Sequence, residues 1–549
     1  MAAVIQALAQ PAAAAESKPR RLRVGLFVDS RLQPDWLAEA FARVAQSDIA
    51  DISLIVEMGP ADGRRADASL VWKLYARADR WAFGRGDDPA ARVDLVARVP
   101  HRTFLGYGPG PLDPGLDLDV AFALGAFDDV ALDGLARYGV WRFAFAPGSE
   151  AALAGFREVA ENAPLTGSAL TVRMVPRGPE RYAYQSWART YPFSAARNRE
   201  QLLRKTSEFA LRALRELHRS GAGWLEQCRP ANQGRTTFSS DEKRGASLNS
   251  VPLVKGLARI GGRMAARGIE KALNVEQWFL AYRFARGSDA RDVPGDLRGF
   301  TRLMPPKDRY WADPFVLEKN GRYFVFFEEL PFKTGRAHIS MLEIGADGRA
   351  SPPVKVLERD HHLSYPFLAE HGGQLYMIPE SAQAGTVEVY RCVDFPLRWK
   401  PERVLMHGVR LVDATFHRGP DRWWMFANAA AEGSRAFDDE LHLFHATSLV
   451  GDWQPHRRNP IKSDVRGARP AGQLFWRNGA LHRPAQICAP LYGSGLSIHR
   501  VLRLTPHDYA ERQVERVLPS EADGLLGVHT INRAGDLTVV DAFCRRSRL

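Results

Sequence analysis

Two runs rich in apolar residues between Trp311 and Glu329 flank the dipeptide Asn320-Gly321. Asn-Gly in this position predicts a β-hairpin, because both residues tolerate the positive φ that a two-residue turn requires. Weaker copies of the same pattern follow at a spacing of roughly 50 residues, each supplying about four short strands. Five such units predict a five-bladed β-propeller in which each repeat is one blade.

The first strand of each unit carries one polar or ionisable residue at the same register: Asp313, Tyr365, Asp413, Arg469 and His529. The innermost strand of every blade lines the central channel of a propeller, so equivalent positions converge on one axis. We therefore expect these five side chains to face a single funnel. The alternative is that Asp-Pro and Asn-Gly only punctuate turns, but the shared register favours a common site.

Strand and helix patterns alternate over the first part of the chain. The expected elements are strands at 22–28, 52–56, 93–98, 119–124 and 138–145, and helices at 34–45 and 68–80. Such alternation predicts an α/β domain with a parallel, doubly wound sheet of the Rossmann type. The first strand-to-helix turn lacks G-x-G-x-x-G, so we expect no dinucleotide there and no cofactor.

Two basic segments follow this domain. Residues 196–219 form a basic amphipathic helix that stops at Gly221 and either packs on the sheet with a solvated face or touches lipid. Residues 226–250 are a polar linker, residues 254–272 a second basic helix, and residues 276–284 a strand that helps to close the propeller. The chain is thus divided into a disordered tail (1–20), an α/β domain (21–220), a linker with a basic helix (221–275) and a propeller (276–549).

Composition narrows the classes of partner. The net charge is +12 and the isoelectric point is about 9.6, which favours phosphate-bearing partners such as nucleotide sugars or anionic lipids. Nucleic acid is not expected, because there is no dense run of basic residues. Four separated cysteines without a C-x-x-C pair, and the lack of a signal-peptide pattern or long apolar run, predict a cytoplasmic protein, in peripheral contact with the membrane at most. No metal site is predicted, since His361-His362 lacks a third spaced ligand.

Residues 22 to about 215 resemble the N-terminal domain of the formyltransferase family. The resemblance is carried by Val24-Gly-Leu-Phe-Val, by Asp119 to Gly125, by Arg137-Tyr-Gly-Val-Trp and by Ser194-Ala-Ala-Arg-Asn. It implies an Asn and a His after the fourth strand, but the window 142–150 contains neither. Without an imidazole or an amide, nothing in that window would move a proton or hold an oxyanion. We therefore expect a domain that has lost catalysis and serves binding or scaffolding.

From Trp278 onward the sequence resembles the N-terminal domain of the plant glucosamine inositolphosphorylceramide transferases and their bacterial relatives. The motifs that carry the resemblance are Trp278-Phe-Leu-Ala-Tyr-Arg, Tyr310-Trp-Ala-Asp-Pro-Phe, Val412-Asp-Ala-Thr-Phe, Arg469-Pro-Ala-Gly, Arg483-Pro-Ala-Gln, Tyr492-Gly and His529-Thr. The resemblance implies a five-bladed propeller similar to those of arabinanases, xylosidases and levansucrases.

In inverting glycosidases of that fold, an Asp of the first blade is the general base, an Asp of the third supports it, and a Glu of the next blade is the acid. Asp313 and Asp413 match the first two positions, but Arg469 occupies the position of the acid. An arginine cannot donate a proton at neutral pH, whereas it neutralises a phosphate leaving group well. The resemblance therefore implies a glycosyltransferase, with catalytic Asp313 and Asp413, a sugar phosphate or nucleotide-sugar donor, and a glycan or lipid-linked acceptor of the kind used to assemble cell-envelope polysaccharides.

The expected substrate-binding residues are Tyr365, Glu380, Arg469, Arg483, Gln486, Tyr492 and His529. Several of these have a structural alternative: Arg469 and Arg483 as salt bridges between blades, Gln486 and Tyr492 as buried hydrogen-bonding groups, and His529 as a channel histidine. Two other functions stay open. The protein is an inverting glycoside hydrolase if Glu380 serves as the acid, or a non-catalytic glycan-binding scaffold if both domains have lost activity.

Overall fold

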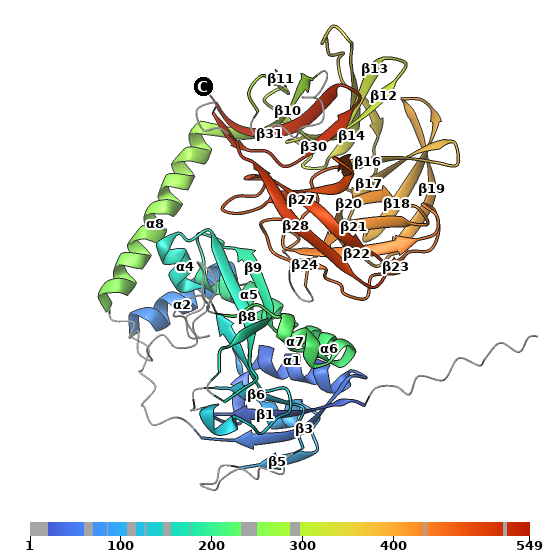
Figure 1. The fold of residues 1–549 in the computed structure, drawn as a ribbon. Helices are drawn as coiled ribbons and strands as arrows, with labels where there is room; N and C mark the ends of the chain where they lie inside the picture. Colours follow the sequence, from blue (N-terminus) through green and yellow to red (C-terminus); the bar gives the residue numbers. More distant parts are fainter. Residues whose placement is uncertain are drawn as a thin grey trace, which may run out of the picture.

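The computed structural model describes residues 20–59, 70–84, 86–106, 117–125, 127, 129–145, 155–176, 178–231, 250–285, 297–431, 434, 436–519 and 524–548. The predicted tail, apart from Arg20, and most of the predicted linker 226–250 lie outside these residues. Within them the chain forms an α/β domain and a separate ring of β-sheets (Figure 1).

The α/β domain is built on one sheet of seven strands. These are β1 (Leu22–Val28), β3 (Ala50–Glu57), β5 (Thr103–Leu105), β6 (Val120–Leu124), β7 (Val140–Phe145), β8 (Leu165–Arg173) and β9 (Arg181–Arg189). Their order is β5-β3-β1-β6-β7-β8-β9. The first five are parallel, in the order of a doubly wound sheet, but β8 and β9 run antiparallel. The sheet is therefore mixed and not wholly parallel as predicted. The change of direction occurs where β8 pairs with β7, and the seven residues between β8 and β9 then allow a hairpin but no crossover helix.

Helices and one additional strand pair complete the domain. They are α1 (Asp35–Gln46), α2 (Leu70–Phe83), α3 (Leu95–Arg98), η1 (Asp129–Leu132), α4 (Phe156–Glu161), α5 (Ala195–Thr206), α6 (Phe209–Ser220) and α7 (Ala222–Gln227), with β2 (Leu32–Pro34) paired to β4 (Arg92–Asp94). The strand expected over 93–98 is wrong in its second half. Asp94 accepts hydrogen bonds from the backbone N–H groups of Val96 and Ala97, and so caps the short helix α3 there.

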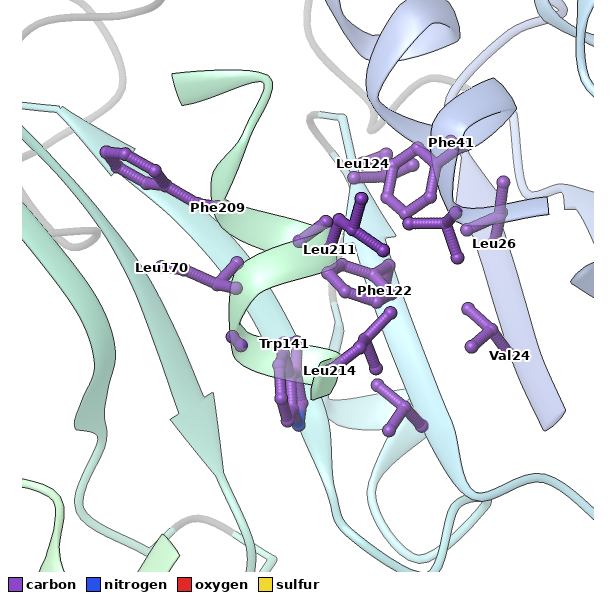
Figure 2. Close-up of a cluster of buried hydrophobic side chains, with 14 of the residues drawn as sticks. Val24, Leu26, Phe41, Phe122, Leu124, Trp141, Leu170, Phe209, Leu211 and Leu214 are labelled. Carbon is purple, nitrogen blue, oxygen red and sulfur yellow. The ribbon is translucent and has the colours of Figure 1, made fainter. Parts of the chain in front are cut away.

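The main core of the domain lies between this sheet and helices α1 and α6. Figure 2 shows Phe41 of α1 beside Phe122 of β6, with Trp141 of β7 near Leu214 of α6. All four side chains are fully buried. The opposite face of the sheet packs against η1 and its flanks in a second cluster, so both faces are covered.

Five β-sheets form the propeller. Blades one and two are β12 (Arg309–Lys319), β13 (Arg322–Pro331), β14 (His338–Ile344) and β15 (Val354–Leu357), and β16 (Ser364–His371), β17 (Gln374–Ser381), β18 (Thr386–Asp394) and β19 (Arg398–His407). Blades three and four are β20 (Leu411–Arg418), β21 (Trp423–Ala429), β22 (Glu440–Ala446), β23 (Gln454–Pro455) and β24 (Lys462–Ser463), and β25 (Phe475–Arg477), β26 (Ala480–Ile487), β27 (Gly495–Leu504) and β28 (Tyr509–Val517). Blade five is β29 (Leu525–Gly527), β30 (Ile531–Ala534), β31 (Leu537–Ser547), β10 (Asn274–Phe284) and β11 (Thr301–Leu303). The five-bladed propeller expected from the repeat is confirmed.

The last blade joins the two ends of the propeller sequence. Strand β10 pairs antiparallel with β31 along its whole length, from Asn274 opposite Ser547 to Phe284 opposite Leu537. The first strand of the propeller thus lies in the same sheet as the last one, as expected for residues 276–284. The Asn320-Gly321 turn also adopts the predicted conformation, with φ values of 55° and 72°.

The basic segment 196–219 is two helices, α5 and α6, and not one. The chain leaves helical register near Thr206 and Ser207, whose hydroxyls bond the carbonyls of Leu202 and Arg204. Both helices pack on the sheet. Lys205 of α5 and Arg212 of α6 reach the propeller and form part of a domain contact, while contact of the segment with lipid stays a prediction.

Three consecutive acidic residues of the propeller receive the α/β domain. Arg212 of α6 bonds both carboxylate oxygens of Glu440, at 2.6 and 3.1 Å. Lys205 Nζ lies 2.8 Å from Asp439 Oδ2, and Arg189 of β9 lies 3.2 Å from Asp438. Because Lys205, Asp439 and Glu440 are buried, these ion pairs fix the relative position of the two domains.

Helix α8 (Ser250–Leu273) runs along one side of the molecule and leads into β10 (Figure 1). Its first half packs through Leu253 and Ile260 against a cluster that includes Phe156 of α4 and Trp72 of α2. Among the described residues, no helix combines the length and hydropathy needed to span a membrane.

Candidate functional site in the propeller funnel

The first strands of blades one to three share a local distortion. Their pairing registers shift between Ala312 and Phe315, between Ser364 and Phe367, and between Val412 and Thr415. Inside each bulge one residue has a positive φ: 51° at Asp313, 44° at Tyr365 and 53° at Asp413. Such conformations cost on the order of 1 kcal/mol or more in a residue other than glycine, and bulges serve to re-aim side chains. In blades one to three, the residues that the sequence places at equivalent positions thus share the same backbone conformation.

Asp313 is held in a buried network with blade five. Its Oδ1 accepts a hydrogen bond of 2.8 Å from the Thr530 hydroxyl and lies 3.5 Å from His529 Nε2. His529 Nδ1 in turn lies 2.5 Å from Oδ2 of Asp541, which also accepts the backbone N–H of Asp313 at 2.8 Å. Asp541 therefore orients both partners of the Asp313–His529 pair.

These contacts shift both ionisation equilibria. Burial raises the pKa of Asp313 to about 8, and the carboxylates of Asp413 and Glu328 act in the same direction against the His529 cation. Burial opposes a charge on His529, but Asp541 and Asp313 outweigh it and raise the pKa of His529 to about 9. Asp313 is therefore a much stronger proton acceptor, once ionised, than an exposed aspartate.

Asp413 is clamped from blade four. Arg469 donates from Nε to Oδ2 at 2.6 Å and from Nη2 to Oδ1 at 3.3 Å. Gln486 donates from Nε2 to the same Oδ2 at 2.9 Å. Asp413 is 1% exposed, so it is a buried carboxylate that is neutralised by a guanidinium and held in one orientation.

Glu380 of β17 lies beside this clamp. Its Oε2 accepts the backbone N–H of Asp413 at 3.2 Å, and the side chain is half-buried. Burial and the adjacent charge of Asp413 hold the pKa of Glu380 well above its ordinary value, although Arg469 opposes this. Glu380 thus binds its proton more tightly than an ordinary glutamate does, a property that a general acid needs.

An aromatic group covers the Asp313 side of the funnel. Trp278 of β10 stacks on His529 with ring centroids 4.0 Å apart, and Tyr492 meets His529 edge-on at 5.3 Å. The guanidinium of Arg469 lies 4.8 Å from the centre of the Tyr492 ring. Gly493 permits this packing, because a Cβ atom there would lie 2.6 Å from Trp278. Tyr492 therefore bridges the two halves of the site.

Three of the predicted binding residues are buried and make hydrogen bonds or ion pairs to other parts of the propeller. Tyr365 is fully buried and its hydroxyl bonds Thr415 and the backbone N–H of Gly472, so it ties neighbouring blades together. Gln486 is also fully buried and serves Asp413. The Arg483 side chain is 1% exposed and forms a two-pronged ion pair with Glu511, within blade four. In this structure Arg483 bonds no other described residue of the funnel, and its salt bridge lies within one blade rather than between blades.

Two carboxylates of the site, Asp541 and Glu328, are not among the functional residues predicted from the sequence. Asp541 lies in the run Leu537-Thr-Val-Val-Asp-Ala-Phe, where a lone charge among apolar strand residues is the signal that could have found it. Glu328 lies near the end of β13, where a carboxylate is usually solvated, but it is buried. It accepts a hydrogen bond from the Tyr310 hydroxyl at 2.8 Å and lies 3.1 Å from His362 Nε2.

The ligand atoms of Asp313, His529 and Asp541 lie within 4.8 Å of one another, which is close enough for a metal ion. Direct contacts account for the same arrangement. Oδ1 of Asp541 accepts the backbone N–H groups of His529 and Thr530, and Oδ2 faces Asp313 N and His529 Nδ1. Both oxygens of Asp541 thus accept backbone hydrogen bonds, which account for the position of this carboxylate.

The funnel opens into a cleft between the two domains. The cleft has a volume of about 360 Å³, and Arg469 and Tyr492 form part of its wall. The facing wall comes from the α/β domain, through β9 and α5. The funnel is thus roofed by the domain whose position the three acidic residues 438–440 fix.

Comparison with known proteins covers the propeller. Residues 304–532 match the model of the family described as glucosamine inositolphosphorylceramide transferase 1, N-terminal. Glucosamine inositolphosphorylceramide transferase 1 of Arabidopsis thaliana is 31% identical over 228 residues, which are 41% of this chain and 30% of that protein. The protein of the same name from Oryza sativa subsp. japonica is 32% identical over 203 residues, 36% of this chain and 27% of that protein. The chain therefore spans less than a third of the length of these curated relatives.

Distant likenesses exist among solved structures. A family 117 glycoside hydrolase of Zobellia galactanivorans is 11% identical with a TM-score of 0.32, over 44% of this chain and 76% of its own. The catalytic domain of the GH62 alpha-L-arabinofuranosidase of Coprinopsis cinerea is 12% identical with a TM-score of 0.32, over 43% and 92%. These likenesses are too distant to bear on activity.

The family model begins at residue 304, so the resemblance of residues 21–220 to formyltransferases is not confirmed and stays a prediction. The resemblance of the propeller has more support, since the sequence repeat, the bulged inner strands and the segment matched by the family model all lie in the same residues. Over residues 304–532 the chain is similar to the N-terminal domain of the glucosamine inositolphosphorylceramide transferase family.

Proposed function

We propose that the propeller is a glycosyltransferase that moves a sugar from a phosphate-activated donor to a hydroxyl of a glycan or lipid-linked acceptor. The observation that carries the proposal is the juxtaposition around Asp413: Arg469 holds this carboxylate, while Asp313, whose pKa is raised to about 8, lies near enough to sense its charge. A base and a fixed positive charge on one funnel are what transfer from a phosphate donor requires. The names of the curated relatives point to the same class of reaction.

Asp313 is the base of the proposed reaction. Its Oδ1 is occupied by Thr530 and faces His529, whereas Oδ2 has no hydrogen bond among the described residues, so Oδ2 is the atom available to an acceptor hydroxyl. The acceptor oxygen attacks the anomeric carbon and gives its proton to Asp313, while the bond from that carbon to the phosphate oxygen breaks. The phosphate leaves as an anion. Arg469 lies in the wall of the cleft and holds Asp413 through Nε and Nη2, and its Nη1, which has no hydrogen bond among the described residues, would stabilise the leaving phosphate.

One comparison tests this assignment. Wild type and Asp313→Asn are incubated with nucleotide sugars and soluble acceptors, and transferred sugar is counted. We expect the variant to lose at least about a hundredfold in kcat/KM, because a general base contributes on the order of 10²–10⁴. An unchanged rate of transfer from every active donor would show that Asp313 is not the base.

A second candidate function is inverting glycoside hydrolysis, and the geometry of Glu380 favours it. This group has the raised pKa of an acid and contacts the backbone of Asp413, within the same funnel as Asp313. Hydrolysis of glycans or aryl glycosides that is lost in Glu380→Gln, without transfer from any phosphate donor, would select this function. The third reading, a non-catalytic scaffold, predicts that neither reaction occurs.

We further propose that the acceptor is presented at a membrane surface, and that α8 and α2 face that surface. Ile269 of α8 and Trp81 of α2 are 63% and 89% exposed. Exposed basic residues, among them Lys255 and Lys73, accompany these apolar side chains, which suits an anionic lipid surface. All four cysteines are free thiols, in keeping with a location on the cytoplasmic side of the membrane.

Vesicle co-sedimentation tests the membrane contact. We expect the protein to sediment with phosphatidylglycerol vesicles but not with phosphatidylcholine vesicles, and Trp81→Ser combined with Ile269→Ser to weaken binding. Trp476→Ser is the matched control, because Trp476 is 67% exposed on the propeller. Equal sedimentation of wild type and the double variant would contradict the assignment of this surface.

A further inference from the structure

The cleft between the domains is lined by an excess of positive charge. Its wall contains four arginines, Arg189, Arg197, Arg204 and Arg469, against two acidic residues, Glu200 and Asp438. Each acidic residue has an arginine neighbour, since Asp438 lies 3.2 Å from Arg189 and Glu200 lies 3.5 Å from Arg204. Arg469 is held by Asp413, so the four arginines meet three carboxylates around a cavity of about 360 Å³, a size typical of small-molecule sites.

Three of the four arginines come from the α/β domain. Arg189 ends β9, and Arg197 and Arg204 lie on α5. The ring of Tyr191, 4.0 Å from the guanidinium carbon of Arg197, supports that side chain against the wall of the cleft. Arginine forks match the oxygens of a phosphate geometrically, so this wall is suited to a ligand with several phosphate oxygens.

The same helix that presents these arginines is fixed to the propeller. Lys205, the residue after Arg204, forms its buried ion pair with Asp439, and Arg212 of α6 holds Glu440. The arginine wall is therefore held at a set distance from Arg469 and does not move independently. The α/β domain thus contributes to the cleft, although residues 142–145, the described part of the window in which formyltransferases carry an Asn and a His, contain neither residue.

The floor of the cleft leads to the carboxylates of the funnel. Arg469 contacts Asp413 directly, and Tyr492 contacts His529, which lies beside Asp313. A phosphate group held in the cleft would thus lie directly above the proposed base and its partners.

We propose that the α/β domain supplies a diphosphate subsite, in which Arg189, Arg197 and Arg204 together with Arg469 bind the diphosphate of the sugar donor. The identity of the ligand as a donor rests on the proposed transferase function; the binding of a diphosphate does not. The diphosphate belongs either to a nucleoside diphosphate sugar or to a sugar linked to an isoprenoid diphosphate.

Calorimetric titration of the full-length protein with inorganic pyrophosphate at physiological ionic strength tests the subsite. We expect one pyrophosphate per chain, and a dissociation constant at least about tenfold higher in Arg197→Gln/Arg204→Gln, because hydrogen bonds to charged groups are strong. The control is Arg98→Gln, since Arg98 forms an exposed pair with Asp35 outside the cleft and should bind as wild type does. No binding to wild type, or equal binding to the double variant, overturns the proposal.

A measurement on wild type alone guards against a variant that folds poorly. Hydrogen exchange of α5 should slow when pyrophosphate is added, and an unchanged exchange rate counts against the subsite. Uridine diphosphate and geranyl diphosphate then distinguish the two sources, since the true donor class should bind more tightly than pyrophosphate.

The outcome for the subsite is separable from that for the transferase. Arginine-dependent binding without transfer from any donor would keep the subsite and reject the transferase. Transfer with an unchanged donor KM in the double variant would keep the transferase and reject the subsite.

Discussion

Arg469 donates two hydrogen bonds to Asp413 across the boundary between blades four and three, and so holds a carboxylate that is 1% exposed. Replacing Arg469 by Gln leaves that carboxylate without its counter-ion. We expect a loss of about 3 kcal/mol in the free energy of unfolding, measured by denaturant titration. Arg466→Gln should cost less than about 1 kcal/mol, because its pair with Asp464 is partly exposed. Equal effects of the two substitutions would contradict a buried clamp.

Glu380→Gln separates the two enzymatic readings. The Gln side chain can still accept the backbone N–H of Asp413, so the fold should be retained. A phosphate leaving group needs no proton, and we therefore expect transfer within about fivefold of wild type, since a general acid is worth 10²–10⁴ where it acts. A loss of a hundredfold or more in kcat, with the melting temperature unchanged, would instead identify Glu380 as an acid.

The Asp313–His529 pair predicts how activity and stability depend on pH. The pKa of Asp313 is raised from 3.8 to about 8. Between pH 4 and 8, Asp313 is therefore protonated in the native state but ionised in the unfolded chain. Stability should therefore fall as pH rises from 4 to 8, whereas kcat/KM should rise toward pH 8 as the base loses its proton. The pKa of His529, about 9 against 6.5, acts in the same direction, since its stabilisation is lost as pH rises through 9.

Melting temperatures of wild type and Asp313→Asn between pH 5 and 9 check this sign. The variant lacks the titrating carboxyl, and its curve should be flatter than that of wild type. Asp347→Asn is the control, because its side chain is 59% exposed and should leave the slope unchanged. Parallel curves for wild type and Asp313→Asn would show that the carboxyl does not titrate as stated.

The sequence predicted the propeller because each blade repeats the turn signals between its strands, and these depend on local backbone geometry. It could not rank Arg469 and Arg483, which occur in the identical triplet Arg-Pro-Ala. Arg469 precedes the inner strand of blade four and faces the funnel, whereas Arg483 lies on β26, where Glu511 of β28 neutralises it. Which partner lies opposite depends on strand pairing, and a single sequence without its pairings does not contain that information.

The cleft could not be predicted either, for a related reason. Asp438, Asp439 and Glu440 belong to no motif in the sequence, and their role appears only when Lys205 and Arg212 lie against them. Docking of two domains joins residues more than 200 positions apart, so no periodicity marks it. By contrast, the positive φ shared by Asp313 and Asp413 follows from one repeated strand, and that part of the site was accessible from the sequence.

The domain contact gives a further prediction. Glu440→Gln removes a carboxylate that is fully buried and bonded twice by Arg212. We expect a destabilisation of about 3 kcal/mol, because the Arg212 guanidinium loses its two short bonds to a carboxylate and keeps only Tyr184 and the more distant Glu208. The measurement is chemical unfolding, with limited proteolysis to detect separation of the domains. Glu161→Gln, which removes an exposed pair with Arg157 within α4, should leave both nearly unchanged, and a similar loss there would argue against a specific docking contact.

Gly493 offers the sharpest test of the packing around His529. Its φ of 66° is unfavourable for any other residue, and a Cβ atom would lie 2.6 Å from Trp278 and 2.9 Å from the His529 Cβ. Gly321 has a similar φ of 72° but no heavy atom within 4 Å of a Cβ, so Gly321→Ala measures the backbone term alone, about 1 kcal/mol. We expect Gly493→Ala to exceed this by about 1–3 kcal/mol, since overpacking forces Trp278 or His529 to move. It should also lower kcat/KM, because His529 positions the proposed base. If both alanine variants cost the same and transfer sugar equally well, the stack of Trp278 on His529 does not constrain the site.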